Sequence, residues 1–190
     1  MTTQDVRFGV QGGLTAGTGK QEKPALFPNL VAITLSPNTM EQPIYADNRV
    51  IYTAQGTSSV ALEITAVSTP DEFKIRHAGE VKTVKGGIAG VLGTTNNEPF
   101  DLIFDSTGTR PRRVLIRNCT VVGSIKHDYT TNTEGIEQQN DIISAVSKGT
   151  LTADGKHLVW QEVYDINSEA AKALETAVPE VPEIKEATTV

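Results

Sequence analysis

The stretch SPNTMEQPIYADNRVIYTAQGTSS, Ser36–Ser59, separates two segments with the pattern of buried strands, Leu30–Leu35 and Val60–Val67. Hairpin connections usually take about two to five residues, and longer loops in compact domains tend to be functional. Folded back on itself as a β-arm at ~3.3 Å per residue, the stretch would project roughly 30 Å from its sheet. Such an arm exposes strand edges that a monomer should avoid, which favours contact with a neighbour. The residues leave open an ordered Ω-loop lying on its own domain.

Alternating apolar residues predict strands on both sides of this arm. The clearest run is Val60, Leu62, Ile64 and Ala66, and further candidates are Val6–Val10, Pro99–Asp105, Val114–Ile125, Asp141–Thr152 and His157–Tyr164. Asp154-Gly155 between the last two predicts a hairpin turn. We therefore expect a mainly β chain of roughly seven to nine strands, with a β-sandwich or barrel-like fold, a long β-arm, a short helix flanking the sheets and extended termini.

Helix signals occur twice. In STPDEFKIRHAG, Thr69 is the predicted N-cap, Pro70 suits the first helical position, Glu72 would complete a capping box, and Gly79 can close the helix. Ser168 is the predicted cap of a second short helix, Glu169–Thr176. From Ala177 on, prolines and alternating glutamates predict a tail.

Three parts follow along the chain. Residues 1–29 are expected to be an N-terminal arm and loop, with a mobile Gly- and Thr-rich segment at Gln11–Pro24. Residues 30–167 are expected to form the β-sandwich domain that carries the 36–59 arm. Residues 168–190 are expected to form the short helix and tail.

The composition is that of a loop-rich, acidic β protein. The 190 residues are 38% hydrophobic and 5% aromatic, with 16 glycines and a formal net charge of -6. One concentration of basic residues, Arg110, Arg112, Arg113 and Arg117, is expected to be a solvated turn or a subunit contact rather than a phosphate site. No secretion signal and no apolar run long enough to span a membrane are present, so we expect the chain to be cytoplasmic when made.

A search for catalytic and ligand-binding patterns gives no enzyme, no cofactor and no metal site. AGTGK at 16–20 resembles a phosphate loop, but Leu14 and Gln21 stand where a P-loop needs Gly and Ser or Thr. His77 is expected to cap a helix, and His127 and His157 are expected to be exposed. Cys119 and Trp160 are expected to be core residues.

The order of these pieces resembles the major tail proteins of long, non-contractile-tailed phages of Gram-positive hosts. The resemblance covers about residues 6–165 and is carried by TLSPNT (34–39), PIYADN (43–48), the alternating strand and capped helix that follow, and GTLTADG (149–155). It implies a tail-tube subunit of the virion that assembles in the host cytoplasm. In that family, β-sandwich subunits form stacked hexameric rings around an acidic lumen that conducts DNA during ejection.

The resemblance also implies partners and contacts. The partners are further copies of the chain, a tape-measure protein, a tail terminator and a baseplate or distal tail protein, with DNA passing through the lumen and no membrane. Candidate residues for contact between rings are Met40, Pro43, Ile44, Tyr45, Ile51 and Tyr52. Acidic candidates for the lumen are Glu63, Asp101, Glu137 and Glu162. The alternative from a different class is a surface β-sandwich that binds carbohydrate or a receptor, although such modules usually expose aromatic side chains.

Overall fold

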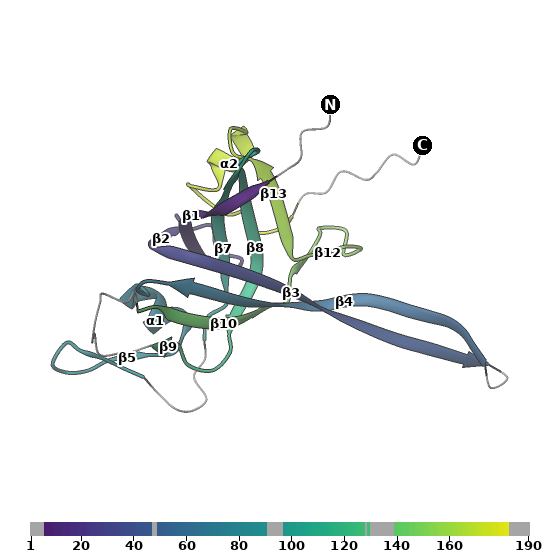
Figure 1. Cartoon of the computed structure of the whole chain (residues 1–190), viewed down its shortest axis with the longest axis horizontal. Coiled ribbons are helices and arrows are strands. Elements are labelled where there is room, and N and C mark those ends of the chain that lie inside the picture. The colour runs from purple at the N-terminus through teal and green to yellow at the C-terminus, as the bar shows by residue number, and fades with distance from the viewer. Residues whose placement is uncertain (1–5, 47–48, 91–96, 128, 130–138, 183–190) are drawn as a thin grey trace.

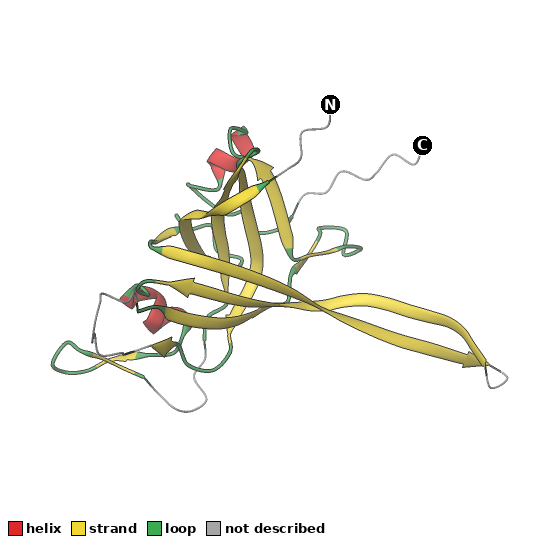
Figure 2. Ribbon diagram, viewed as in Figure 1, coloured by secondary structure: helices red, strands yellow, loops and turns green. Residues whose placement is uncertain are grey.

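A computed structural model describes residues 6–46, 49–90, 97–127, 129 and 139–182. These residues are mainly antiparallel β with two short helices (Figures 1 and 2). In chain order the elements are β1 (Arg7–Gly17), β2 (Ala25–Phe27), β3 (Leu30–Ala46), β4 (Arg49–Ala66), α1 (Asp71–His77), β5 (Val81–Lys82), β6 (Ile88–Ala89), β7 (Phe100–Gly108), β8 (Arg112–Val121), β9 (Lys126–His127), β10 (Asp141–Ser147), β11 (Thr150–Leu151), β12 (Leu158–Val159), β13 (Gln161–Asp165) and α2 (Glu169–Ala173).

One large sheet organises the described residues. Its main path runs β2-β1-β7-β8-β10-β4-β3, with β13 joined to β8 and β9 joined to β10. β3, at one end of this order, also packs against β1 near the other end, so the sheet curls around its core (Figure 1). Within the described residues no ladder joins these two ends, so the sheet does not close into a barrel.

The sheet buries side chains on both of its faces. Leu102, Phe104, Val114 and Ile116 belong to the main core, which also contains Leu62 and Ile64 of β4. The residues between them point the other way, because successive side chains of a strand alternate between faces. Ile103 and Leu115 accordingly lie in a second cluster with Ala16, Leu174 and Val178. Both faces of β7 and β8 are therefore covered.

The N-terminal segment is part of this sheet, which corrects the expectation of a mobile loop from Gln11 onward. β1 pairs with β7 from Arg7 to Gly17 and with β2 on its other side. The backbone conformation and packing of β1 require glycine at two positions. Gly12 has a φ of +65° at a register shift, and a Cβ on Gly13 would lie 2.4 Å from the Phe27 carbonyl oxygen. The segment is rich in glycine because a bulge and a close backbone approach require it.

β8 divides the sheet at Asn118. One edge of β8 pairs with β7, whereas the other pairs first with β13 and then with β10. Between these two partners Asn118 has a φ of +51°. The predicted hairpin at Asp154-Gly155 is confirmed, but it joins only the short strands β11 and β12. The longer strands on either side, β10 and β13, pair with β8 rather than with each other.

Helix α1 begins differently from the prediction. Pro70 is the N-cap, and no described side chain caps the helix; the Thr69 backbone N–H instead donates to Asp141 Oδ2 at 2.7 Å. The capping box was therefore wrong. The predicted end is confirmed, since Gly79 has a φ of +73° and the Glu80 N–H donates back to the Lys74 carbonyl at 3.0 Å.

The C-terminal segment up to Pro182 packs on the sheet, which corrects the expectation of a tail from Ala177. Ser168 caps α2 as predicted, its hydroxyl accepting from the Ala171 N–H at 3.1 Å. Leu174 and Val178 are each 2% exposed and cover Ile103 and Leu115. None of the described helices is long and apolar enough to cross a membrane.

Candidate functional site

The β3–β4 hairpin extends far beyond the rest of the sheet (Figures 1 and 2). The ladder between its two strands runs from Leu30 opposite Ala66 to Ala46 opposite Arg49. β10 covers the outer side of β4 only from Val60 to Ala66. We call the remainder, Asn38–Ala46 with Arg49–Ser59, the arm. At ~3.3 Å per residue, its β3 half spans roughly 30 Å.

The root of the arm is fixed to the core. Val60, Leu62 and Ile64 are buried, and Ile33 and Leu35 on the paired strand pack against the same core. At the first rung of the arm, Asn38 Nδ2 donates to Ser59 Oγ at 3.0 Å. A rigid root allows the arm to hold its direction, since the strands continue without a break from the packed sheet.

The register of the arm contains two shifts, one between Asn38 and Thr39 and one between Ile44 and Tyr45. Each places one extra residue on β4, at Ser58 and at Ile51. Bulges of this kind bend the strand and increase its right-handed twist. They are consistent with the twist of the arm visible in Figure 1.

The predicted contact residues all lie on the arm. Ile44 is directly opposite Tyr52, Pro43 is opposite Thr53, Met40 is opposite Gly56, and Tyr45 is opposite Val50, with Ile51 at the register shift. Directly opposite residues share one face of a two-stranded ladder. Ile44 and Tyr52 therefore form one cross-strand pair. The side chains of residues 39–57 are outside what the structure describes, so their role in contact stays a prediction.

The predicted lumen acids do not lie together. Glu63 is exposed at the root of the arm, where it borders an open groove of about 350 Å³ that Thr34, Ser36 and Ser144 also line. Glu162 is half-buried on β13 and forms an ion pair with Arg117. Glu137 lies outside the described residues.

The expectation that Asp101 lines the lumen is corrected, because its side chain lies inside the protein. The residue is 1% exposed, and its Oδ1 accepts from Thr18 Oγ1 and from the Asn118 N–H, both at 2.8 Å. Burial raises the pKa of Asp101, against the lowering effect of these hydrogen bonds. Asp101 therefore supports the backbone at the split in β8 and is not available to line a solvent-filled channel.

The basic concentration on β8 is also partly internal, which corrects its interpretation as a solvated turn or subunit contact. The Arg113 guanidinium binds both carboxylate oxygens of Asp105, at 2.7 and 2.9 Å, and donates to the Ala171 carbonyl at 2.9 Å. Arg117 is 1% exposed and donates to the Pro179 carbonyl at 2.7 Å. These two side chains hold the C-terminal segment on the sheet.

Sequence reasoning missed this C-terminal attachment. A signal was present, because Ala171, Leu174 and Val178 follow one another at spacings of three and four residues, which places apolar side chains on one face of a helical segment. The basic residues that receive the segment lie on a distant strand, and no local pattern connects them to it.

The histidines and the cysteine have structural environments. The His77 ring centroid lies 5.1 Å from the ring centroids of both Phe73 and Phe100, and its Nδ1 is 2.8 Å from the Glu98 carbonyl oxygen. Burial lowers the pKa of His77. The side chain therefore lies in the core and does not cap the helix, although this was expected of it. His127 was expected to be exposed but is half-buried, with its Nδ1 2.6 Å from Asp141 Oδ1. Cys119 is a core residue as predicted, and burial raises its pKa well above the usual value.

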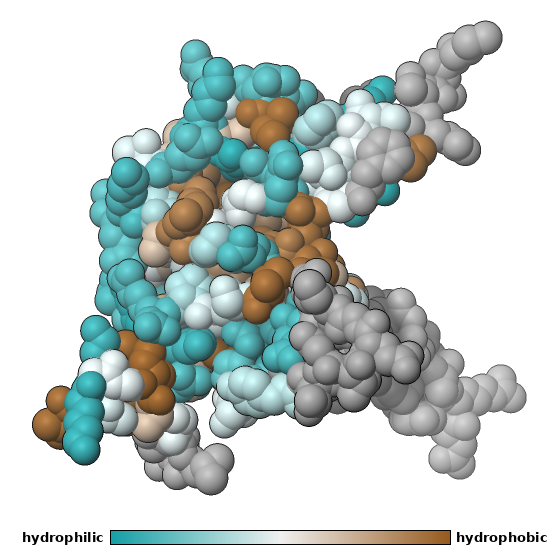
Figure 3. Space-filling view, turned by 60° about the vertical axis from the view of Figure 1, so that its left-hand side comes forward, coloured by the Kyte–Doolittle hydropathy of each residue, from teal (hydrophilic) through white to brown (hydrophobic). Residues whose placement is uncertain are grey.

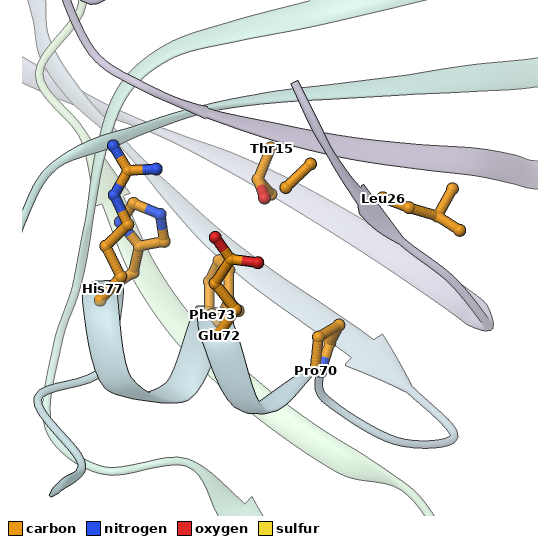
Figure 4. A pocket seen from close by; sticks show the side chains of 8 residues that line it. Thr15, Leu26, Pro70, Glu72, Phe73 and His77 are labelled. Carbon is orange, nitrogen blue, oxygen red and sulfur yellow. The ribbon is translucent and has the colours of Figure 1, made fainter. Parts of the chain in front are cut away.

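A small cavity lies between α1 and the strands β1 and β2 (Figure 4). Its volume is about 30 Å³, and Thr15, Leu26, Phe73 and His77 are among its lining residues. This is room enough for a water molecule, which needs at least about 10–15 Å³. Arg76, which also lines the cavity, forms ion pairs with Glu22 and Glu98, and these tie the helix to the segments that precede β2 and β7.

The resemblance of residues 16–20 to a phosphate loop has a different structural basis. Gly17 is the last residue of β1, and its N–H donates to a Glu22 carboxylate oxygen at 2.7 Å. A carboxylate thus occupies the donor that a phosphate would need. Among the described residues, no group of three His, Cys, Asp or Glu side chains could hold a metal ion.

Apolar side chains are also exposed on the body of the molecule. Leu26 is 67% exposed and Val122 is 54% exposed. Figure 3 shows apolar surface in the middle of one face, bordered by hydrophilic side chains. No protein-family model matches this sequence, and comparison with curated proteins gave no significant match.

Proposed function

We propose that this chain is a structural subunit that assembles with copies of itself into a tube, as the tail-tube proteins of long-tailed phages do. The observation that carries the proposal is the arm, whose two strands continue for roughly 30 Å without a third strand beside them in the described part of the chain. An isolated two-stranded ribbon is at best marginally stable in water. Contact with a neighbouring subunit would supply the missing burial.

In this proposal the arm reaches from one ring to the next. The fixed root supports such a role, because the arm must hold a defined direction relative to its own subunit to contact the next ring. The six predicted residues of the arm, headed by the Ile44–Tyr52 pair, provide apolar groups for the contact. The tape-measure protein, the terminator and the baseplate are the further partners expected of such a subunit.

The acidic balance of the chain fits a conduit for DNA. A net charge of -6 disfavours adsorption of a polyanion, because like charges repel at short range. Glu63 is the predicted lumen acid that the structure describes as exposed. We place it at the lumen in this proposal and exclude the buried Asp101.

Deleting Asn38–Gln55 tests the proposal. Pro37 pairs with Val60, so the deletion leaves Gly56–Ser59 as a connection of about four residues, a common hairpin loop length. The shortened chain should remain folded and monomeric at concentrations at which the full chain forms tubes in negative stain. Normal tubes from the shortened chain would contradict the role given to the arm.

A surface module that binds carbohydrate or a receptor is the alternative. Such a module would need aromatic side chains displayed at a groove, and the single tryptophan, Trp160, is half-buried against the core. A groove of about 510 Å³ beside Arg110 has one aromatic lining residue, Tyr164, and is otherwise lined mainly by polar residues. Concentration-dependent assembly favours the tube, whereas a monomer that binds glycans favours the module.

A further inference from the structure

The two outer edges of the arm differ in their backbone donors. β3 contains Pro37 and Pro43, whereas β4 contains no proline between Arg49 and Ser59. Proline has no backbone N–H, and within a sheet it is confined to places where the missing donor faces away from the paired strand. The two prolines therefore identify which backbone groups of the arm point outward.

The register extends this assignment to both strands. Pro43 is opposite Thr53, and directly opposite residues of an antiparallel pair direct their backbone groups the same way, either toward each other or outward. Every second rung is then outward. On β3 the outward residues are Pro37, Thr39, Glu41 and Pro43. On β4 they are Thr53, Gln55 and Thr57, which pair with Pro43, Glu41 and Thr39.

The root of the arm agrees with this assignment. Pro37 is opposite Val60, so Val60 also directs its backbone groups away from β3, and on that side Val60 pairs with Ser147 of β10. Because the register shift places one extra residue, Ser58, on β4, Thr57 directs its backbone groups away from β3, as Val60 does. The outward backbone groups of Thr53, Gln55 and Thr57 thus lie on the same edge of β4 that β10 covers from Val60 to Ala66.

These edges have unequal capacity to accept another strand. The β3 edge lacks a donor at two of its outward rungs, a device by which sheet proteins prevent edge-to-edge pairing. The β4 edge keeps its donors and acceptors at each outward rung from Thr53 to Thr57. Among the described strands, only β3 pairs with β4 in this region.

The same chain carries a matching free edge on β13. In the described residues β13 pairs with β8 alone, and the Arg117 N–H donates to the Trp160 carbonyl at 3.0 Å. This bond directs Trp160, and with it Glu162 and Tyr164, toward β8. Gln161 and Val163 therefore direct their backbone groups outward, and Val163 is 45% exposed. β13 contains no proline.

We propose that the outer edge of β4, from Thr53 to Thr57, pairs with the outer edge of β13 of a second copy of this chain, while the β3 edge remains unpaired. This inference rests on the proposed self-assembly and adds to it the edge and the partner strand. Main-chain hydrogen bonds would provide the affinity, as in other cases in which a strand is added to a sheet edge. Pairing two different edges makes the contact head-to-tail, which allows stacking to continue.

Two proline substitutions at one rung give a matched test. Thr57→Pro removes an outward donor from the β4 edge, and Thr39→Pro removes the directly opposite donor from the β3 edge. Both replace threonine by proline where the ladder between β3 and β4 tolerates it. Loss of an interstrand bond at each of many equivalent contacts should raise the critical assembly concentration of Thr57→Pro by about tenfold or more. Thr39→Pro should assemble like the unmodified chain.

Hydrogen exchange on the unmodified chain provides a second readout that does not depend on how a variant folds. In the assembled state the amides of Thr53, Gln55, Thr57 and Val163 should exchange at least about tenfold more slowly than in the monomer, as newly bonded amides do. The amides of Thr39 and Glu41 should not change.

The outcomes distinguish a failure of the strand-pairing proposal from a failure of the proposed self-assembly. If Thr57→Pro has the same critical assembly concentration as the unmodified chain, or if amide exchange at Thr53 and Gln55 is unchanged, the β4 edge is not the paired edge, while self-assembly stands. Equal defects in Thr57→Pro and Thr39→Pro overturn the difference between the edges. Slowed β4 amides with an unchanged Val163 overturn β13 as the partner. An unmodified chain that stays monomeric overturns the proposed function and this inference with it.

Discussion

Arg113 and Asp105 form a bidentate ion pair between adjacent strands, with Nε–Oδ1 and Nη2–Oδ2 distances of 2.7 and 2.9 Å. Both side chains are about nine-tenths buried, and the remaining Arg113 nitrogen donates to the Ala171 carbonyl and to Glu175. The pair connects the sheet to the C-terminal segment. It also raises the pKa of Arg113, chiefly through the hydrogen bond to Asp105, so the arginine stays charged.

Arg113→Ala should destabilise the fold strongly, because it leaves the Asp105 carboxylate buried without its partner. Breaking a buried pair from one side costs about 3–5 kcal/mol. Chemical denaturation measures the loss. Arg110→Ala, an exposed change on the neighbouring turn, is the control and should stay within about 0.5 kcal/mol. A similar small effect for Arg113 would contradict the structural role of the pair.

Leu174→Ala should also destabilise the protein, by about 3 kcal/mol, because it opens a cavity against Ile103 and Leu115. Lys172→Ala changes an exposed residue of the same helix and should have little effect. Thermal unfolding of both variants provides the comparison. If Leu174→Ala melts like the unmodified protein, the C-terminal segment does not pack as described.

Mild acid should weaken the fold through His77. Burial lowers the pKa of His77 below its usual value, so the unfolded chain binds this proton more readily than the folded one. The stability that His77 contributes is therefore present above about pH 6.5 and is lost as the pH falls through its folded pKa. Melting temperatures from pH 7.5 to 5.5 should fall less steeply in His77→Phe than in the unmodified chain.

His157→Ala is the control for this pH dependence, since His157 is exposed. Its melting temperatures should follow the slope of the unmodified protein. Equal slopes for all three proteins would show that His77 does not contribute to the acid response.

The backbone at Asn118 makes a prediction about the split in β8. A φ of +51° is costly for most residues and free for glycine, and the Asn118 side chain also donates to the Gly149 carbonyl at 2.9 Å. Asn118→Ala should lose about 1–3 kcal/mol from strain and the lost bond. Asn118→Gly should lose less, because it removes the strain. The reverse order in urea unfolding would contradict the left-handed conformation.

The Ile44–Tyr52 pair makes a prediction about assembly. Changing both residues to serine should weaken assembly and leave monomer stability almost unchanged, because the pair lies on the arm beyond the packed core. The neighbouring pair Gln42 and Ala54 provides a matched double-serine control. Sedimentation velocity over a range of concentrations measures both. Equal assembly of the two variants would remove Ile44 and Tyr52 from the proposed contact.

Much of the sheet could be predicted because its strands alternate strictly. Val60 to Ala66 has one face in the core and one face outside. Phe100, Leu102 and Phe104 also enter the main core at every second position, although Ile103 on the other face of β7 is buried as well. The length of Ser36–Ser59 and its flanking strands allowed either a β-arm or an Ω-loop, and the structure shows the arm. The turn at Asp154-Gly155 was predicted from local chemistry that needs no distant partner.

The missed features depend on residues distant in sequence. β1 has a loop-like composition because Gly13 lies too close to Phe27 and Leu30 for a larger side chain. The sequence around Gly13 does not indicate this close contact. Asp101 alternates with apolar residues as a surface residue would, but the bend at Asn118 brings a donor that holds it inside. The C-terminal segment is held by Arg113 and Arg117, which look like surface charges in the sequence.

Electron microscopy of the concentrated, unmodified chain tests the central claim most directly. If the chain is a tube subunit, stacked rings or tubes should become more abundant with concentration, and the chain lacking Asn38–Gln55 should give none under the same conditions. A field of separate monomers from the unmodified chain at every concentration, or tubes of normal length from the shortened chain, would contradict it.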